Sequence, residues 1–278
     1  MYNFLINLLL ISFTIPIHTK ISIPKLPTKV SDFFSRSKEE ITHHEFNDVE
    51  KLDLTNIHGD ISVETWKQHC VLIEVRKKGS AHFLEQSGID AQCKNHTLLA
   101  NTKIKDATAT GTIKIHILVP ENLPLKLTTI HGIVSVQNHN GPLDLSTEWG
   151  AINVEEGNNT VLAKTIQGNI TIKRKQMKHG HALNAQTSHG NITIMVPQDF
   201  GADMEAHTTA GKITSDIFIS LHSQTILLND ETFKQMKFHV RGWVGHPQNT
   251  DNPTTILLTT DYGMINIIPY SKHTKPKK

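Results

Sequence analysis

The residues of this sequence best suited to acid–base chemistry are two adjacent carboxylates, Glu155 and Glu156. An enzyme that cleaves polysaccharides needs a second acid, or carboxylates that share a hard cation such as Ca²⁺, and in a repeating β structure these groups would come from neighbouring repeats. The matching positions one repeat earlier and one repeat later hold no acid: Gln137, Asn138, Lys173 and Arg174. We therefore interpret the two glutamates as solvated charges and predict no catalytic residue.

Histidine is the second chemical candidate, because the chain contains 18 histidines and imidazole is a common zinc ligand. His131 and His189 each precede a repeated glycine, but three repeats of about 4.8 Å would hold them about 14 Å apart, too far to share an ion. The pairs His43–His44 and His179–His181 have no Cys, Asp or Glu at ligand spacing. The sequence therefore predicts no metal and no other cofactor.

Composition and short motifs exclude several other classes of protein. The formal net charge is +2, and Lys and Arg are spread along the chain, so there is no basic stripe of the kind that binds nucleic acid. The sequence also lacks a Gly-rich phosphate loop leading into a helix, a G-x-S-x-G motif and a C-x-x-C pair. We predict that nucleic acid is not a partner.

The element that must position any functional side chain is an internal repeat. Seven glycines share one frame, in which the residues seven and five positions before the glycine and two and four positions after it are apolar, with Ser215 as the one exception. Alternation on both sides of the glycine predicts two short strands, and the alternation slips by one residue at the glycine, which predicts a tight corner with unusual dihedral angles. The predicted structural corner residues are Gly59, Gly132, Gly150, Gly168, Gly190, Gly211 and Gly263.

One such repeat cannot bury its own apolar face, so successive repeats must stack. The sequence thus predicts an all-β, single-stranded β-solenoid of about seven coils. Two series of residues are expected on its surface, at the position three residues after the glycine and at the position just before it. The first series is polar and comprises Ser62, Ser135, Asn153, Thr171, Thr193, Thr214 and Asn266. The second series holds stacked or partly exposed corner side chains and comprises His58, His131, Trp149, Gln167, His189, Ala210 and Tyr262.

The two longer intervals between glycines predict departures from the regular coil. Between Gly59 and Gly132 lie "VLIEV" from Val71 and "TIKIHILV" from Thr112, which we interpret as an N-terminal sheet that caps the first coil. Between Gly211 and Gly263 we expect an irregular coil and a loop.

Several segments of this repeat resemble the bacterial putative adhesin family of unknown function with β-strand repeats. The segments are "LDLTNIHGDISV", "VPENLPLKLTTIHG", "LNAQTSHGNITIMVP" and "RGWVGH" followed by "ILLTTDYGMINI", and the resemblance covers Glu45 to Pro269. It implies a stack of β coils in an extracytoplasmic or envelope-associated protein for which adhesion is proposed. The family has no assigned catalytic residues, so no functional residue is carried over.

The ends of the chain and its cysteines complete the predicted organisation. Residues 1–19 have the apolar run of a signal peptide, with an uncleaved N-terminal anchor as the alternative. A linker is expected over 20–44, the β-solenoid domain over 45–269 and a basic tail over 270–278. Cys70 and Cys93 are either two small buried side chains or, in an oxidising compartment, a disulfide.

These observations predict a non-catalytic, extracytoplasmic binding protein, adhesin-like or envelope-associated, located in the periplasm, at the cell surface or outside the cell. Its expected ligand is an envelope or surface glycan or protein, and any membrane contact is through the N-terminal segment. A polysaccharide-active β-helix enzyme, lyase or hydrolase, is the first alternative, and an envelope protein that binds another protein along its coils is the second.

Overall fold

The structure is a computed structural model that describes residues 37–177, 179–198, 200–222, 238–245 and 253–270. The chain divides into two units, Met1–Arg36 and Ser37–Lys278, and every described residue lies in the second unit. The predicted signal peptide over 1–19 and the basic tail beyond 270 lie outside the described residues. Part of the expected linker is strand, since β1 begins at Lys38 and pairs with a neighbouring strand along its whole length.

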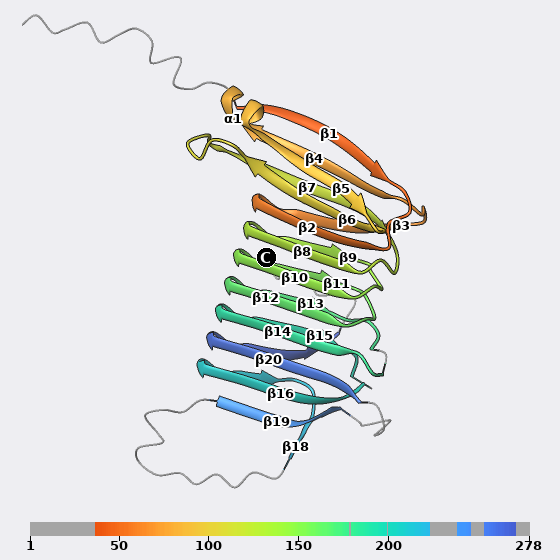
Figure 1. Cartoon of the computed structure of the whole chain (residues 1–278). Helices are drawn as coiled ribbons and strands as arrows, with labels where there is room; N and C mark the ends of the chain where they lie inside the picture. Colours follow the sequence, from red (N-terminus) through yellow and green to blue (C-terminus); the bar gives the residue numbers. More distant parts are fainter. Residues whose placement is uncertain (1–36, 178, 199, 223–237, 246–252, 271–278) are drawn as a thin grey trace, which may run out of the picture. The chain divides into compact units, whose positions relative to one another are not determined.

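The described strands form two sheets that face each other (Figure 1). Sheet A has ten strands, in the spatial order β1 (Lys38–Phe46), β4 (Val71–Gly79), β7 (Gly111–Pro120), β3 (Ile61–Trp66), β9 (Val134–Gln137), β11 (Ile152–Glu155), β13 (Ile170–Lys173), β15 (Ile192–Val196), β21 (Ile265–Pro269) and β17 (Ile213–Ser215). Sheet B has eleven, in the order β18 (Ile219–Leu221), β19 (Phe238–Gly245), β16 (Gly201–Ala210), β20 (Thr254–Tyr262), β14 (Ala182–His189), β12 (Val161–Gln167), β10 (Leu143–Trp149), β8 (Leu125–His131), β2 (Lys51–His58), β6 (Thr97–Ile104) and β5 (Ser87–Lys94).

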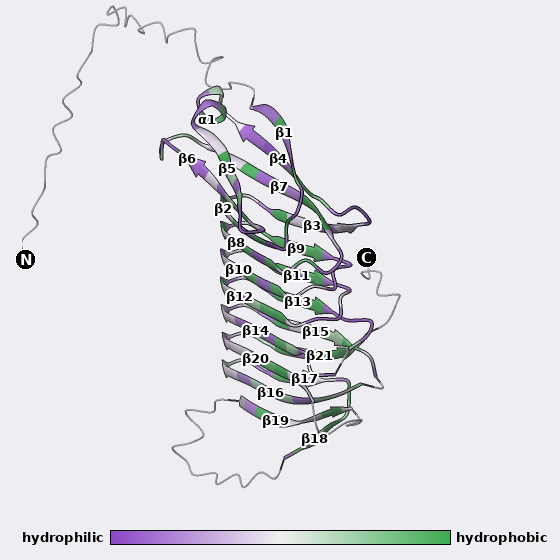
Figure 2. Ribbon diagram, turned by 45° about the vertical axis from the view of Figure 1, so that its right-hand side comes forward, coloured by the Kyte–Doolittle hydropathy of each residue, from purple (hydrophilic) through white to green (hydrophobic). Residues whose placement is uncertain are grey.

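Each predicted corner glycine joins one strand of sheet B to one strand of sheet A, and we name each such strand pair a coil after its glycine. Adjacent coils pair in parallel and in register, so that Leu145 lies beside Leu127 and Ala163, and Ile152 lies beside Val134 and Ile170. These apolar side chains fill the space between the sheets and are almost fully buried. Figure 2 shows the resulting mixture of hydrophobic and hydrophilic residues along the strands. The predicted all-β solenoid is confirmed.

The coils do not stack in chain order. The last coil in the sequence, that of Gly263, is inserted between the Gly190 and Gly211 coils, because β20 pairs with both β14 and β16, and β21 pairs with both β15 and β17. Figure 1 shows β20, in the blue of the C-terminal residues, between the earlier strands β14 and β16. Stacking one coil after another along the chain, as the repeat suggests, is therefore wrong at this end.

Both ends of the stack are covered by additional strands that include antiparallel pairs. At the N-terminal end β7, β4 and β1 extend sheet A beyond the Gly59 coil, β6 and β5 extend sheet B, and the short helix α1 (Ala81–Gln86) buries Phe83 between them. This is the cap that the sequence predicts. At the other end β19 pairs antiparallel with β16 and β18. Residues 238–245, where we expected irregular structure, are thus a regular strand that covers the edge of the last coil.

The two cysteines are both free thiols. Cys70 is buried just before β4, whereas Cys93 is exposed on the edge strand β5. Of the two alternatives left open by the sequence, the disulfide is absent, and the buried side chain holds only for Cys70.

The corner glycines form a column in which there is no room for a side chain. A Cβ atom on Gly150 would lie 1.9 Å from the carbonyl oxygen of Gly132, and one on Gly168 would lie 1.8 Å from that of Gly150. Among the seven, only Gly59, Gly132 and Gly190 take a positive φ. The expectation of unusual dihedral angles therefore fails at Gly150, where close approach of the neighbouring coil is what requires glycine.

A second column, of buried hydroxyl groups, bonds the corners to one another. The residue three positions before the glycine is Thr in six coils and Asn56 in the Gly59 coil, and all seven are buried. Each Thr hydroxyl donates to the carbonyl oxygen of the corner glycine in the preceding coil of the stack, at 3.0–3.2 Å. Each bond satisfies a carbonyl that faces the interior, where an unpaired polar group is costly. The donors are Thr129, Thr147, Thr165, Thr187, Thr260 and Thr208.

Replacing Gly150 by Ala is predicted to destabilise the stack by at least about 3 kcal/mol, because the added methyl group must push two coils apart. Thermal denaturation followed by circular dichroism measures the effect. Asn153→Ala, a half-buried outward position in the same coil, serves as the control and should change the melting temperature little. Equal shifts in the two variants would contradict the close packing of the glycine column.

Thr165→Val is predicted to cost about 1–2 kcal/mol, because it keeps the shape of the side chain but leaves the Gly150 carbonyl without its hydroxyl donor. Thr165→Ser keeps the donor and should lose less. The comparison is made by urea denaturation of the three proteins, and a Val variant as stable as wild type would show that the hydroxyl column contributes nothing.

Candidate functional site

The glutamates singled out in the sequence are bonded to two different partners. The Glu155 carboxylate lies 3.1 Å from the Lys173 ammonium group and is flanked in register by Gln137 and Lys173. The Glu156 carboxylate accepts a hydrogen bond of 2.8 Å from the Tyr270 hydroxyl. Across the described ranges, no three His, Cys, Asp or Glu side chains gather closely enough to hold a metal ion.

The predicted polar series forms a straight row on the outer face of sheet A. In stack order it comprises Ser62, Ser135, Asn153, Thr171, Thr193, Asn266 and Thr214, each paired in register with the next. All seven are half-buried, and within the row the Thr214 hydroxyl donates to the Asn266 side-chain oxygen at 2.7 Å. We call this the polar row. A hollow of about 250 Å³ lies along it, lined in part by Ser135, Asn153 and Thr171.

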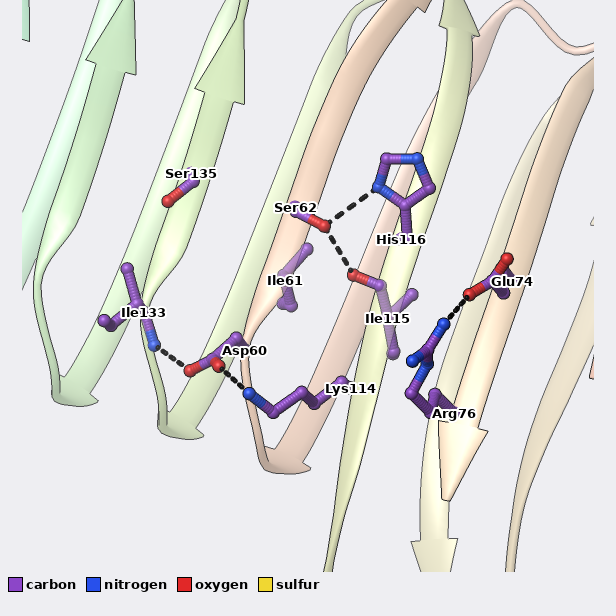
Figure 3. A pocket seen from close by; sticks show the side chains of 10 residues that line it. All are labelled: Asp60, Ile61, Ser62, Glu74, Arg76, Lys114, Ile115, His116, Ile133 and Ser135. Carbon is purple, nitrogen blue, oxygen red and sulfur yellow. Dashed lines mark hydrogen bonds and ion pairs between the residues drawn. The ribbon is translucent and has the colours of Figure 1, made fainter. Parts of the chain in front are cut away.

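A larger hollow of about 510 Å³ lies at the cap end of the polar row (Figure 3). It forms where sheet A passes from the coils to the cap, in which β7 pairs parallel with β3 and β4 pairs antiparallel with β7. The Ser62 hydroxyl on β3 lies 3.0 Å from Nδ1 of His116 on β7, and Ser135 of the next coil also lines the hollow. This hollow continues the polar row with one more hydrogen-bonding side chain.

The charged groups of the larger hollow are already paired with one another. Lys114 lies 2.9 Å from Asp60, and Arg76 lies 3.1 Å from Glu74. Partial burial alone would raise the pKa of Asp60, but hydrogen bonds from Lys114 and from the Ile133 N–H outweigh it and lower that pKa. The Arg76 hydrogen bond likewise lowers the pKa of Glu74. With its charges neutralised in pairs, the hollow is better suited to an uncharged, hydroxylated ligand than to an ion.

The residues just before the glycines form a second row, along the corner itself, which we call the corner row. In stack order it reads His58, His131, Trp149, Gln167, His189, Tyr262 and Ala210. The rings of His58 and His131 stack at 4.6 Å, those of His131 and Trp149 at 6.2 Å, and those of His189 and Tyr262 at 4.9 Å between centroids. His131 and His189, singled out as zinc candidates, are kept apart by the coils of Trp149 and Gln167.

A buried histidine lies at the opposite ends of the coils, away from both rows. His139 is 1% exposed, and its Nε2 donates to the Leu123 carbonyl oxygen at 2.7 Å. Burial lowers its pKa. The pKa of His58 in the corner row is also lowered, first by burial and then by the nearby His131. Both shifts favour the neutral imidazole over the protonated one.

A model of the Toastrack DUF4097 family matches residues 18–227. The chain belongs to the Toastrack DUF4097 family. The matched range contains every coil except the inserted Gly263 coil, which follows it in the sequence. No curated protein matches the chain in sequence.

The fold of this Toastrack protein is similar to those of solved bacterial structures. A putative cell adhesion protein from Clostridium sporogenes is 15% identical with a TM-score of 0.50, over 84% of this chain and 100% of that one. Putative adhesins from Bacteroides fragilis and Parabacteroides distasonis are 11% and 9% identical with TM-scores of 0.29 and 0.31, over 84% of this chain and 97% and 98% of theirs. The Clostridium sporogenes structure shows that the fold is shared. Within the described residues, no helix is long and apolar enough to cross a membrane.

The sequence located both rows but missed the hydroxyl column that holds them in register and the hollow at the cap. The signal for the column was present, as a Thr three residues before the glycine in six of the seven repeats. The hollow depends on which cap strand lies beside the Gly59 coil, and no local pattern marks that pairing.

Acidification is predicted to destabilise the protein through His139 and His58. Because their pKa values are lowered in the folded state, the unfolded chain takes up protons first, so stability is full above about pH 6.5 and falls as the pH drops below it. Melting temperatures from pH 8 to 5 measure the slope. His139→Gln should flatten it, whereas the exposed His69→Gln should leave it unchanged, and equal slopes in all three proteins would contradict the assignment.

Proposed function

We propose that this protein is an adhesin-like binding protein, non-catalytic and extracytoplasmic, that holds its ligand along the outer face of sheet A. The observation that carries the proposal is the polar row: seven uncharged hydrogen-bonding side chains at one position of successive coils, with the two hollows beside it. Family membership and the shared fold of a putative cell adhesion protein support it by likeness.

The outer face of sheet B is less suited to the same task. The position six residues before the glycine holds an irregular mixture of charged, apolar and amide side chains there, as in Asp144, Leu162 and Asn184. Two neighbouring charges, Lys126 and Asp53, are paired at 3.2 Å. At this position of sheet B a ligand with a regular repeat would meet different chemical groups on successive coils, whereas the polar row offers an uncharged polar group on every coil, at intervals of about 4.8 Å.

The separation of the carboxylates supports a non-catalytic role. General acid–base cleavage of a glycosidic bond requires two carboxyl groups on either side of the bond. Glu155 is instead paired with Lys173 on the adjacent coil, and Glu156 with Tyr270. Ser62 and His116 lie within hydrogen-bonding distance in the cap hollow, but Glu74, the carboxylate beside His116 in register, is bonded to Arg76 and His43 instead.

The test is to incubate the full chain with acidic and neutral polysaccharides, with and without Ca²⁺, and to measure both binding and product. We expect saturable binding without new reducing ends or unsaturated products. Turnover that is abolished by Glu155→Gln with Glu156→Gln, or by Ser62→Ala, would contradict the proposal and favour the polysaccharide-active enzyme.

A matched pair of variants locates the ligand. Asn153→Arg with Thr171→Arg places two bulky charges on adjacent coils of the polar row and should weaken binding at least about tenfold. Ser146→Arg with Thr128→Arg does the same at half-buried positions on sheet B and should leave binding unchanged. Equal losses, or a loss only in the second variant, would show that sheet A is not the binding face.

A further inference from the structure

We infer that the corner row contains a separate subsite, between Trp149 and His189, that binds one pyranose ring of a glycan. The inference rests on the adhesin-like function proposed above and names a class of ligand for it. It also places a contact on an edge of the solenoid that the polar row does not reach.

The geometry shows an interrupted ring stack. One face of the Trp149 indole is covered by His131, whose ring is nearly parallel to it, with an interplanar angle of 6°. On the other side the adjacent coil carries Gln167 instead of a ring, and the coil after it carries His189, which is stacked on Tyr262. Two coil spacings, or about 9.6 Å, therefore separate the residues on either side of the interruption.

A ring placed over Gln167 would complete this stack. It would lie about 4.8 Å from the coil of Trp149 and about 4.8 Å from the coil of His189. This distance is within the range of centroid separations seen for stacked rings. The Trp149 side of the interruption is accessible, since that residue is 50% exposed, and Ile166 beside Gln167 is 47% exposed. Among the described residues, no hydrogen bond or ring contact involves the Gln167 side chain. The subsite thus combines an indole face, an exposed aliphatic side chain and an amide with unused donors and acceptors.

A pyranose has the matching chemistry. Its axial C–H bonds give it an apolar face that packs against the electron-rich face of an indole. Its equatorial rim carries hydroxyl groups, or an acetamido group, that can donate to and accept from the Gln167 amide. One aromatic face and one amide are enough to hold and orient a single sugar ring.

Other ligand classes fit the subsite less well. An anionic group would have no Lys or Arg partner at this corner, because neither residue type flanks the two residues of the corner, such as Gln167 and Gly168, in the Gly132, Gly150, Gly168 and Gly190 coils. Glu148, next to Trp149, is itself acidic. A stable protein partner would bury about 800 Å² of surface on each side. The exposed apolar strip here is narrow, and the polar residues Ser188, Asn169 and Asn191 flank it.

The experiment is calorimetric titration of the full chain with cellotetraose and, separately, with chitotetraose. The two sugars share the β-linked pyranose ring and differ in the acetamido group, so the two arms distinguish a plain glucan from an N-acetylated glycan. We expect at least one of them to bind, and Trp149→Ala to weaken that binding about tenfold or more. Leu162→Ala, which removes an exposed apolar side chain away from the corner, is the matched control and should bind as wild type does.

Gln167→Trp provides a test that loss of folding cannot explain. The new indole would fill the interruption and continue the stack, so the variant should melt at a higher temperature than wild type and bind neither sugar. Absence of binding by wild type, or binding that survives both Trp149→Ala and Gln167→Trp, would overturn the subsite. If binding is instead lost only in Asn153→Arg with Thr171→Arg, the subsite is overturned while the proposed function stands.

Discussion

The close approach of successive corners is the constraint on which the rest of this structure depends. Each corner glycine brings its backbone so near to the next coil that no Cβ fits. The glycine N–H donates to the carbonyl of the residue before the next corner, as from Gly150 to Gln167 at 3.0 Å, and its own carbonyl accepts a Thr hydroxyl. These bonds fix the corners in register, and the strands on both sides then pair in register as well. Every row of outward side chains is straight for this reason.

Much of this architecture could be predicted from the sequence because the repeat is local. Alternation around a glycine identifies both strands of a coil, and two residues with the same place in the frame, such as Ser135 and Asn153, must lie side by side if their coils are adjacent. The order of the coils is a different matter. The Gly211 and Gly263 repeats have the same frame, so nothing within either one shows which of them packs on the Gly190 coil. That choice is made by pairing over a long sequence separation, between β14 and β20.

The candidate site likewise has some features that are set within one repeat and others that are set by pairing between distant segments. The polar row could be predicted, since each of its residues is defined by its own corner. The stacking of Tyr262 on His189 could not, because it exists only through the inserted coil. Nor could the contact between Ser62 and His116, which joins a coil to a cap strand that lies outside the repeat. Of the residues missed, only the Thr column was visible in the sequence. A repeat that is defined by its apolar positions alone does not include a buried polar position.

A stack of identical coils also favours one kind of chemistry over another. Catalysis needs unlike groups that converge on one bond from different directions, held within a fraction of an ångström. Parallel strands in register do the opposite: they place like groups at equal intervals and point them the same way, as in the run from Ser135 to Thr193 on sheet A. Such a surface matches a ligand that itself repeats, because each coil adds a weak contact and the contacts act together once the first has formed. Under the proposed function, the departures from the repeat at the cap hollow and at Gln167 would distinguish a particular unit of such a ligand from its neighbours.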